Sequence, residues 1–332
     1  MVQKLKNILS LSFLAVLGLF SSGCGQQPDS SGQIVLGVIP KSTGGEFWGT
    51  VHDGAKQAEA EHGVRIRWEG TVTETEIAEQ NQIIENMITM GVHGIALAPL
   101  NSRAMRGQVQ KAVQAGIPVV IFDSGVEGDA HTSFVATDNR QGGAMGAKHL
   151  LTLLEEGERR VMVMRYVQGA GSTEDRAAGF IEHAEANGLD IVAHPYPETG
   201  TIEGCKNAAA NTLEGFVRDG RLELDGLFAC NLYSTLGVLS ALNDLRNSGI
   251  DVDGLRFVGF DTSRALLDAL NDGRIHALVA QNPVRMGYLA VETLVKVVQG
   301  EPVEELIDTG VAVVTRENLE NDPEIRAMVG LD

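Results

Sequence analysis

Short apolar runs alternate with amphipathic segments along almost the whole chain of 332 residues. This recurring strand-then-helix unit predicts parallel sheets that are covered by helices on both faces. The expected strands are residues 34–39, 64–68, 93–98, 117–122, 132–137, 160–167, 189–193, 226–229, 255–260, 276–280, 306–309 and 311–314. The expected helices are residues 45–61, 77–90, 102–115, 142–155, 172–186, 202–218, 234–248, 264–271 and 284–299, followed by a polar tail.

The alternation restarts after residue 138, so it divides the chain into two sets of similar size. Asp138 opens a polar stretch that runs to Gly143, and it looks like a crossing from one domain to another. The residues around Gln281 indicate a second crossing, because a strand ends there in polar residues and Pro283 then favours a helix start. The fold class that we predict is therefore α/β, with two doubly wound parallel-sheet lobes.

The first 23 residues have the proportions of a signal peptide. Lys4 and Lys6 precede an apolar core at residues 8–20, which is shorter than the roughly 20 residues of a membrane span. The sequence Ser-Ser-Gly-Cys ending at Cys24 resembles a bacterial lipobox, although Ser21 stands where Leu is usual. We expect a signal peptide at 1–23 and a polar tether at 24–32. Cys24 is the candidate lipidation site, and plain secretion is the alternative.

Composition and motifs exclude several classes of function. The net charge of −18 argues against nucleic acid, whose affinity comes from Lys and Arg at phosphates. The eight histidines show no metal-ligand spacing, and no GxSxG nucleophile motif is present. Glu174 stands where a dinucleotide fingerprint after Gly169 and Gly171 needs its third glycine. We expect no metal, no cofactor and no enzymatic activity.

The two cysteines of the folded part leave a choice open. Cys205 lies near an expected helix start, and Cys230 lies at the end of the next expected strand. Both ends of such a unit lie at the same edge of a sheet, so a disulfide is conceivable in an exported chain. Unpaired burial is the alternative, because Cys is a common small core residue.

Polar and aromatic side chains stand where expected strands end. Phe47 and Trp48 follow the first strand and its glycine-containing loop. Because ligands bind at the carboxyl ends of strands in open α/β sheets, these residues are candidates for a binding site. Asp, Asn and Gln supply the acceptors and donors that a neutral polyhydroxyl ligand needs, and an aromatic ring supplies a flat apolar face. The polar candidates, each directly after an apolar run, are Asp123, Asn231, Asp261 and Gln281.

The chain resembles the ribose-type periplasmic sugar-binding proteins, which have the periplasmic binding protein type I fold. The resemblance covers residues 33–315 and also extends to the ligand-binding core of lactose-repressor-type regulators. It rests on these ordered motifs: EFWGTVHDGA at 46–55, ALAPLNSRA at 96–104, IPVVIFDS at 117–124, VATDNRQGG at 135–143, DRAAGF at 175–180, LFACN at 227–231, VGFD at 258–261 and VAQNPVRMGYLAVET at 279–293.

The resemblance implies two lobes that are joined by a three-stranded hinge and close over a ligand. The implied N-terminal lobe is residues 33–137 plus 283–309, and the implied C-terminal lobe is residues 138–281 plus 310–320. Carried over by motif, the two aromatic residues would stack on the ligand and the polar candidates would bind its hydroxyl groups. The full set of expected ligand-binding residues is Lys41, Phe47, Trp48, Asp123, Ser124, Arg176, Asn231, Asp261 and Gln281.

Three departures from the ribose binders put ribose itself in doubt. Ser124 and Glu174 stand where those proteins have arginines, and Ala98 stands where they have an asparagine. Arg176 is retained. Lys41 could supply a replacement charge, as in receptors for the furanosyl autoinducer, or it could be a solvated loop lysine.

The resulting expectation is an exported receptor for a small sugar or polyol that delivers its ligand to an ABC permease. Its expected location is the periplasm or the cell surface, with membrane attachment only through lipid at Cys24. A sensor that docks on a membrane receptor or kinase is the alternative. An exported enzyme on the same fold would need a base and a nucleophile in contact, and no motif supplies them.

Overall fold

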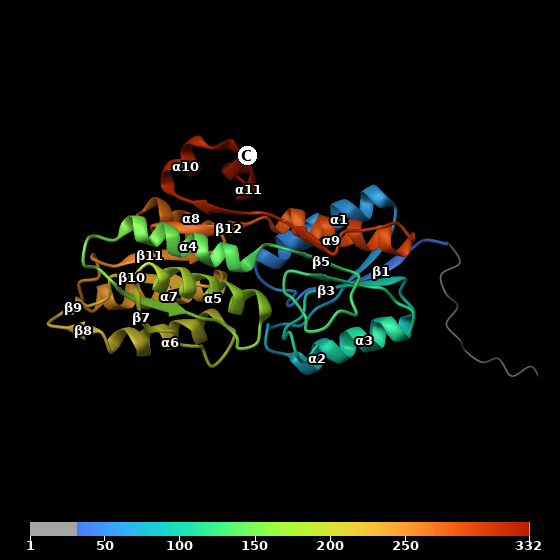
Figure 1. Ribbon diagram of the computed structural model, residues 1–332, viewed down its shortest axis with the longest axis horizontal. Coiled ribbons are helices and arrows are strands. Elements are labelled where there is room, and N and C mark those ends of the chain that lie inside the picture. Colours follow the sequence, from blue (N-terminus) through green and yellow to red (C-terminus); the bar gives the residue numbers. More distant parts are fainter. Residues whose placement is uncertain (1–31, 332) are drawn as a thin grey trace, which may run out of the picture. The chain divides into compact units, whose positions relative to one another are not determined.

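The computed structural model describes residues 32–331 of the chain, so the expected signal peptide and Cys24 lie outside it. From Ile34 onward the chain forms one compact unit that contains two six-stranded sheets and a short hairpin (Figure 1). The predicted two-lobed α/β fold is confirmed. The exact residues at which one lobe gives way to the other stay a prediction.

The first sheet belongs to the N-lobe, which is this sheet with its covering helices. Its strand order is β13-β5-β4-β3-β1-β2, and every pair is parallel. Its strands are β1 (Val35–Ile39), β2 (Arg65–Trp68), β3 (Gly94–Leu97), β4 (Val119–Phe122), β5 (Ser133–Ala136) and β13 (Leu306–Asp308).

The second sheet belongs to the C-lobe, again defined as the sheet with its helices. Its order, β14-β12-β11-β10-β6-β7, repeats that of the first sheet position by position, except that β14 runs antiparallel to β12. Its strands are β6 (Arg160–Met164), β7 (Asp190–Ala193), β10 (Gly226–Ala229), β11 (Arg256–Phe260), β12 (Ala277–Gln281) and β14 (Val311–Val314).

Helices cover both faces of the first sheet, as Figure 1 shows. α1 (Glu46–His62) and α9 (Pro283–Val298) pack together on one face, where Trp48 and Phe122 are buried. α2 (Ile77–Met90) and α3 (Arg106–Gln114) cover the other face, over Ile39 and Ile121. Successive residues of the strands alternate between these two cores, as the pleat requires.

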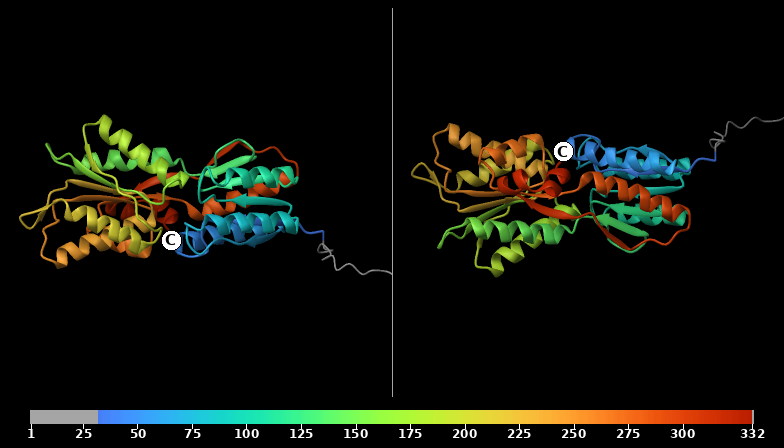
Figure 2. Two further views of the ribbon diagram at one scale, coloured as in Figure 1. Left: turned by 90° about the horizontal axis from the view of Figure 1, so that it is seen from below. Right: turned by 90° about the horizontal axis from the view of Figure 1, so that it is seen from above.

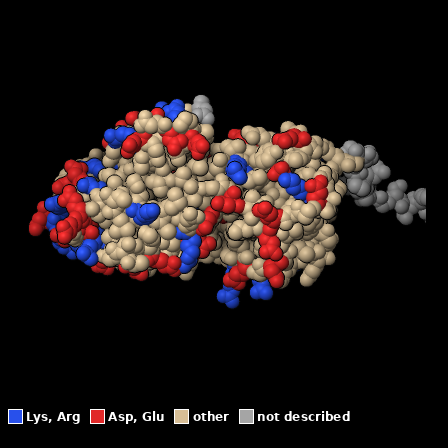
Figure 3. Space-filling model, turned by 45° about the horizontal axis from the view of Figure 1, so that its top comes forward, with Lys and Arg blue, Asp and Glu red and all other residues tan. Residues whose placement is uncertain are grey.

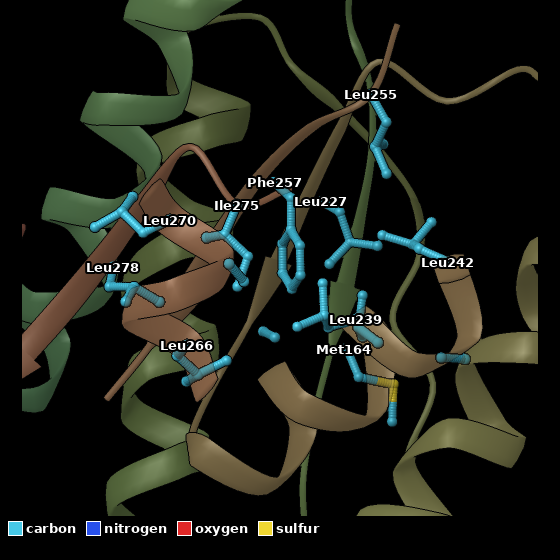
Figure 4. Close-up of a cluster of buried hydrophobic side chains, with 14 of the residues drawn as sticks. Met164, Leu227, Leu239, Leu242, Leu255, Phe257, Leu266, Leu270, Ile275 and Leu278 are labelled. Carbon is cyan, nitrogen blue, oxygen red and sulfur yellow. The ribbon is translucent and has the colours of Figure 1, made fainter. Parts of the chain in front are cut away.

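The second sheet is covered in the same way (Figure 2). α4 (Asn139–Leu153) and α5 (Gly171–Ala186) lie on one face, and α6 (Ile202–Glu214), α7 (Leu232–Asn247) and α8 (Arg264–Asn271) lie on the other. The core beneath the second group is the larger, and Phe257 and Leu227 stand at its centre in Figure 4.

Three crossings connect the lobes, and their residues touch one another. Thr137 follows β5, Gln281 ends β12, and Thr309 follows β13. The hydroxyl of Thr137 donates to Oε1 of Gln281 at 3.0 Å and lies 3.1 Å from the hydroxyl of Thr309. All three residues are buried, so the hinge is a packed polar cluster rather than three loose linkers.

Glycines let the helices of the N-lobe cross in backbone contact. A Cβ added to Gly54 of α1 would lie 1.9 Å from the carbonyl oxygen of Val284 in α9. A Cβ added to Gly287 of α9 would lie 1.9 Å from the carbonyl oxygen of Val51. Gly143 and Gly179 make the equivalent crossing of α4 and α5 in the C-lobe. Only glycine fits at such an approach.

Two expected helices begin three or more residues away from their predicted starts. α3 begins at Arg106 instead of 102, because the side chain of Asn101 accepts bonds from the amides of Arg103 and Ala104 and holds a turn there. α4 begins at Asn139 instead of 142, because Asp138 caps it by accepting from the amide of Gln141.

Two further segments were wrongly predicted. The helix expected at 202–218 ends at Glu214, and a hairpin of β8 (Val217–Arg218) and β9 (Arg221–Leu222) follows around an Asp219-Gly220 turn. The expected polar tail folds into α10 (Arg316–Asn321) and α11 (Pro323–Met328), which pack against the larger core of the C-lobe.

On the face shown in Figure 3, acidic residues form bands and basic residues stand scattered among them. This agrees with the net charge of −18. Among the helices that the structure describes, none has both the length and the hydropathy of a membrane span.

Candidate ligand-binding site

The carboxyl ends of the central strands of both sheets border one small interlobe cavity of about 30 Å³. Eight of the nine expected ligand-binding residues line this cavity, and Ser124 lies fully buried beside it. The structure therefore brings the predicted residues together from both lobes. The lining residues are Lys41, Phe47, Trp48, Glu74, Asp123, Ser172, Thr173, Arg176, Asn231, Leu232, Tyr233, Asp261 and Gln281.

Asp123 and Asp261 occupy equivalent positions in the two lobes. Each directly follows the third strand of its sheet in the shared order, β4 and β11, and each adopts a positive φ, 61° and 69°. Residues other than glycine rarely adopt such a backbone angle, and Asp is among the residues that tolerate it best. Non-glycine residues in this conformation are found at functional sites more often than elsewhere.

The carboxylate of Asp261 is the centre of the C-lobe half of the site. Its Oδ1 accepts from Nε2 of Gln281 at 2.7 Å, and its Oδ2 accepts from the amide of Leu232 at 2.8 Å. The guanidinium of Arg176 lies 3.8 Å away. Burial raises the pKa of Asp261, and Arg176 partly counteracts this effect. Through Gln281, the carboxylate is also joined to the hinge residue Thr137.

Arg176 is buried and has partners on several sides. Its Nε donates to Oδ1 of Asn139 at 2.8 Å, and its Nη1 donates to the carbonyl oxygen of Cys230 at 3.1 Å. The guanidinium also lies 3.8 Å from the centre of the Phe260 ring. These contacts hold a charge that would otherwise be costly to bury.

Lys41 supplies the other cation of the site, from the loop after β1. Its Nζ lies 2.7 Å from Oδ2 of Asp123, and it donates to the hydroxyls of Ser124 at 2.6 Å and Ser172 at 3.1 Å. Only 3% of this lysine is exposed, which rules out the alternative of a solvated loop lysine.

The aromatic residues form a wall that spans both lobes. Phe47 contacts the large core of the C-lobe as well as the core beneath α1 and α9, and its ring meets Trp48 edge to face. Trp48 is 2% exposed, and its Nε1 donates to Oε1 of Glu74 at 2.8 Å. Tyr233 of the C-lobe stacks on Tyr166. Stacking of Trp48 on a ligand stays a prediction.

Asn231 both caps a helix and faces the cavity. Its Oδ1 accepts from the amide of Ser234, and the hydroxyl of Ser234 accepts from the amide of Asn231. This reciprocal pair begins α7. The side-chain nitrogen of Asn231 is left for another partner.

Comparison with known proteins gives the family. Residues 36–302 match the periplasmic binding protein domain family, which is most of the chain. The chain belongs to the periplasmic binding protein family. The members of this family are substrate-binding proteins for transport, so the expectation of a binding protein rather than an enzyme is confirmed.

Two curated relatives and two solved structures illustrate the similarity to this binding protein. The D-ribose/D-allose-binding protein of Pseudomonas aeruginosa is 29% identical over 84% of this chain and 88% of its own length. The ribose import binding protein of Bacillus subtilis is 26% identical over 87% and 91%.

The solved structures are of two bacterial solute-binding proteins. A carbohydrate transporter protein from Agrobacterium radiobacter, in complex with D-arabinose, has a TM-score of 0.83 and 31% identity, covering 90% of this chain and 100% of its own. An ABC transporter solute-binding protein from Agrobacterium vitis, with bound D-fucose, has a TM-score of 0.81 and 34% identity, covering 88% and 98%.

Five lining residues of this binding protein were missed by the reasoning from sequence. Leu232 and Tyr233 open α7 directly after Asn231, just as Phe47 and Trp48 open α1, and that parallel could have found them. Ser172 and Thr173 stand at the start of a correctly expected helix. Glu74 lies in an irregular loop, where no periodicity signals its direction.

The question of Cys205 and Cys230 is settled by their placement. Both thiols are fully buried and free, and Cys205 packs against Gly237 where α6 crosses α7. Burial raises the pKa of each thiol to about 12, so both stay protonated and unreactive.

Glu74 gives this binding protein a testable pH dependence. Burial raises the pKa of its carboxyl above the ordinary 4.5, while the charge of Lys41 and the bond from Trp48 lower it in part. The folded state thus holds the proton more tightly than the unfolded state. Stability from this group is full below pH 4.5 and is lost as pH rises through the folded pKa. Glu74→Gln should therefore gain stability relative to wild type as pH rises.

The measurement is urea unfolding from about pH 4 to about pH 8. Gln retains an acceptor for the indole of Trp48, so only the titration is removed. Glu79→Gln, on the exposed face of α2, is the control and should run parallel to wild type. A constant difference between Glu74→Gln and wild type across this range would contradict the raised pKa.

Proposed function

We propose that this chain is an exported receptor that binds a small neutral sugar or polyol between its lobes and delivers it to an ABC importer. The observation that carries the proposal is a cavity whose polar groups come from both lobes, with an aromatic wall beside them. Hydroxyl groups of a sugar both donate and accept, so they match a lining that mixes amides, hydroxyls and carboxylates.

The charges around the cavity favour a neutral ligand. Lys41 is paired with Asp123, and Arg176 lies beside Asp261. The raised pKa of Glu74 favours its neutral form. A phosphate, a sugar acid or an amine would bring a charge that finds no uncompensated partner in this lining, and desolvating that charge is costly.

Several polar groups are left for ligand hydroxyls. Within the described contacts, several lining atoms have no hydrogen-bond partner in the protein. They include Nδ2 of Asn231, the phenol oxygen of Tyr233, Oε2 of Glu74 and both side-chain oxygens of Asp123, of which Oδ2 lies 2.7 Å from Nζ of Lys41. They come from both lobes, so a ligand that uses them joins the lobes. The cavity of about 30 Å³ holds little more than water, and a sugar would enter when the lobes part.

The names of the relatives support the same ligand class. Relatives named for D-ribose and D-allose, and solved structures with D-arabinose and D-fucose, all concern neutral monosaccharides. Ser124 in place of the arginine of the ribose binders makes a ligand other than ribose part of the proposal, because a serine cannot replace two guanidinium donors.

The location of this receptor is supported by its family, whereas its membrane attachment, its partner and its lobe boundaries rest on the sequence. The family indicates a place outside the cytoplasm. Lipid attachment at Cys24, a permease partner, and lobe boundaries at residues 137–138, 281–283 and 309–310 are proposed on the sequence signals given above.

The proposal is tested by thermal unfolding with D-ribose, D-allose, D-arabinose, D-fucose and neutral polyols, and with gluconate and glucosamine as charged controls. At a hundred times its Kd, a cognate neutral sugar should stabilise the chain by about 2.7 kcal/mol. The charged controls should give no shift. If no neutral sugar stabilises the chain, or if a charged analogue stabilises it most, the proposed ligand class is wrong.

A further inference from the structure

The lining of the interlobe cavity holds more carboxyl groups than cations. Its two cations each lie beside an aspartate, since Lys41 is 2.7 Å from Asp123 and Arg176 is 3.8 Å from Asp261. The third carboxyl, that of Glu74, has no cation in contact with it among the described residues. A carboxylate that is removed from water without a paired cation is costly, so such a group takes up a proton instead.

Glu74 lies in the loop between β2 and α2, which is irregular but firmly tied to the loop after β1. The hydroxyl of Thr71 donates to the carbonyl oxygen of Lys41 at 2.6 Å, and the amide of Thr43 donates to the carbonyl oxygen of Thr71 at 2.9 Å. The carboxylate of Glu76 closes the turn by accepting from two backbone amides of the loop. These bonds hold Glu74 at the cavity.

The two oxygens of Glu74 have different surroundings. Oε1 accepts from Nε1 of Trp48 at 2.8 Å, and Oε2 has no partner in the protein. Because an indole N–H can only donate, Oε1 must be an acceptor. A proton on this carboxyl is therefore carried by Oε2, which makes Oε2 a hydrogen-bond donor to the cavity.

The phenol of Tyr233 belongs to the same cavity, on the side of the C-lobe. Its ring stacks on Tyr166 with the ring centres 5.9 Å apart, and its oxygen has no partner in the protein. A negative charge at Glu74 raises the pKa of both phenols, as expected for groups that are close together. A sugar hydroxyl accepts one hydrogen bond and donates another, so a single hydroxyl can pair with both residues.

We propose that Glu74 is a specificity-determining residue that binds the sugar as a neutral carboxylic acid. Oε2 of Glu74 donates to one hydroxyl group of the sugar, and that hydroxyl donates to the phenol oxygen of Tyr233. The inference rests on the proposed function and deepens it, because it selects neutral sugars that carry a hydroxyl at this end of the cavity. It also makes sugar affinity depend on pH.

The sign of this dependence follows from the groups that face Glu74. Burial raises the pKa of its carboxyl, Lys41 and the bond from Trp48 lower it in part, and Asp123 and Asp261 raise it further. As pH rises through this pKa, Oε2 loses its proton and can no longer donate, so sugar affinity falls. Burial also raises the pKa of the groups that face Glu74 from the C-lobe, which keep their protons at neutral pH: Tyr166, Tyr233 and Cys205.

The test is isothermal titration calorimetry of wild type and Glu74→Gln with D-ribose, D-allose, D-arabinose and D-fucose, from about pH 5 to about pH 9. Gln keeps the acceptor for Trp48 and places an N–H donor at the position of Oε2, so it imitates the neutral carboxyl at every pH. For the sugar that binds best, both chains should agree within about threefold at the acid end, and wild type should bind at least about tenfold more weakly at the alkaline end. Asp261 titrates in both chains, so its effect cancels in the ratio.

Two further variants complete the test. Tyr233→Phe keeps the ring that stacks on Tyr166 and should weaken binding about tenfold at every pH, because only the phenol oxygen is lost. Glu79→Gln, on the exposed face of α2, is the matched control and should follow wild type throughout.

Two results would overturn this role of Glu74. One is a ratio of affinities between Glu74→Gln and wild type that stays constant with pH, which would leave Glu74 as a mere partner of Trp48 or as an ionised acceptor. The other is wild-type affinity in Tyr233→Phe. If wild type binds none of the four sugars, the proposed function itself fails and this inference falls with it.

Discussion

Asp261→Ala should abolish sugar binding, with a loss of at least about 100-fold in affinity. The substitution removes the acceptor for Nε2 of Gln281 and for the amide of Leu232, and it leaves Arg176 without the carboxylate beside it. A bound sugar would lose its own contact and would also meet a disordered wall. Isothermal titration calorimetry with the sugar that stabilises wild type most gives the loss directly.

The same substitution should lower the free energy of unfolding by about 2 kcal/mol, because buried donors lose their acceptor while the cost of burying a carboxylate is relieved. Asp219→Ala is the matched control. Asp219 also has a positive φ, 50°, but lies in the exposed turn between β8 and β9. Asp219→Ala should lower the free energy of unfolding only by the cost of placing Ala at a positive φ, and it should bind sugar with wild-type affinity. Wild-type affinity in Asp261→Ala would make Asp261 merely a strand-end residue.

Gly54→Ala should lower the free energy of unfolding by about 3 kcal/mol or more. Its Cβ would stand 1.9 Å from the carbonyl oxygen of Val284, and backbone on both sides of the crossing must move to admit it. Val284 is the second residue of α9, directly after the crossing at Gln281. The clash therefore also displaces the hinge, and sugar affinity should fall with stability.

Gly49→Ala is the control for this effect, because Gly49 lies in the same helix, is exposed, and has no neighbour within 4 Å of an added Cβ. It should gain about 0.5–1 kcal/mol from helix propensity. Urea unfolding of both variants checks the pair. Equal stability of the two variants would mean that α1 and α9 do not cross in backbone contact.

The sequence was informative wherever a pattern maps onto a periodic element. Strand ends could be located because an apolar run stops there, and parallel topology brings such ends to one edge. This reasoning is why Asp123, Asn231, Asp261 and Gln281 could be placed together. It could not reveal that Gln281 also bonds to the hinge, since that bond is a tertiary contact. The cap that Asn231 gives α7 is local, because its partner is the amide of Ser234 three residues later.

The structure of irregular segments was harder to predict from the sequence. Glu74 lies in a loop whose direction is decided by contacts with Trp48, and Ser172 acquires its role only when the other lobe is in place. The two C-terminal helices were missed even though their caps were visible, namely Thr315 with Asn318 and Asp322 before Pro323. Their polar composition argued against a packed element, and the few apolar residues that bury them are too widely spaced to form a pattern.

The order of strands in the two sheets has a consequence for synthesis. β13 and β14 complete the two sheets, yet they are made after every other strand of the chain. While the ribosome is still translating α9, the N-lobe lacks an edge strand and the C-lobe lacks its antiparallel partner for β12. Neither lobe can finish folding before the other has been synthesised, so the chain gains its full stability late and as a whole.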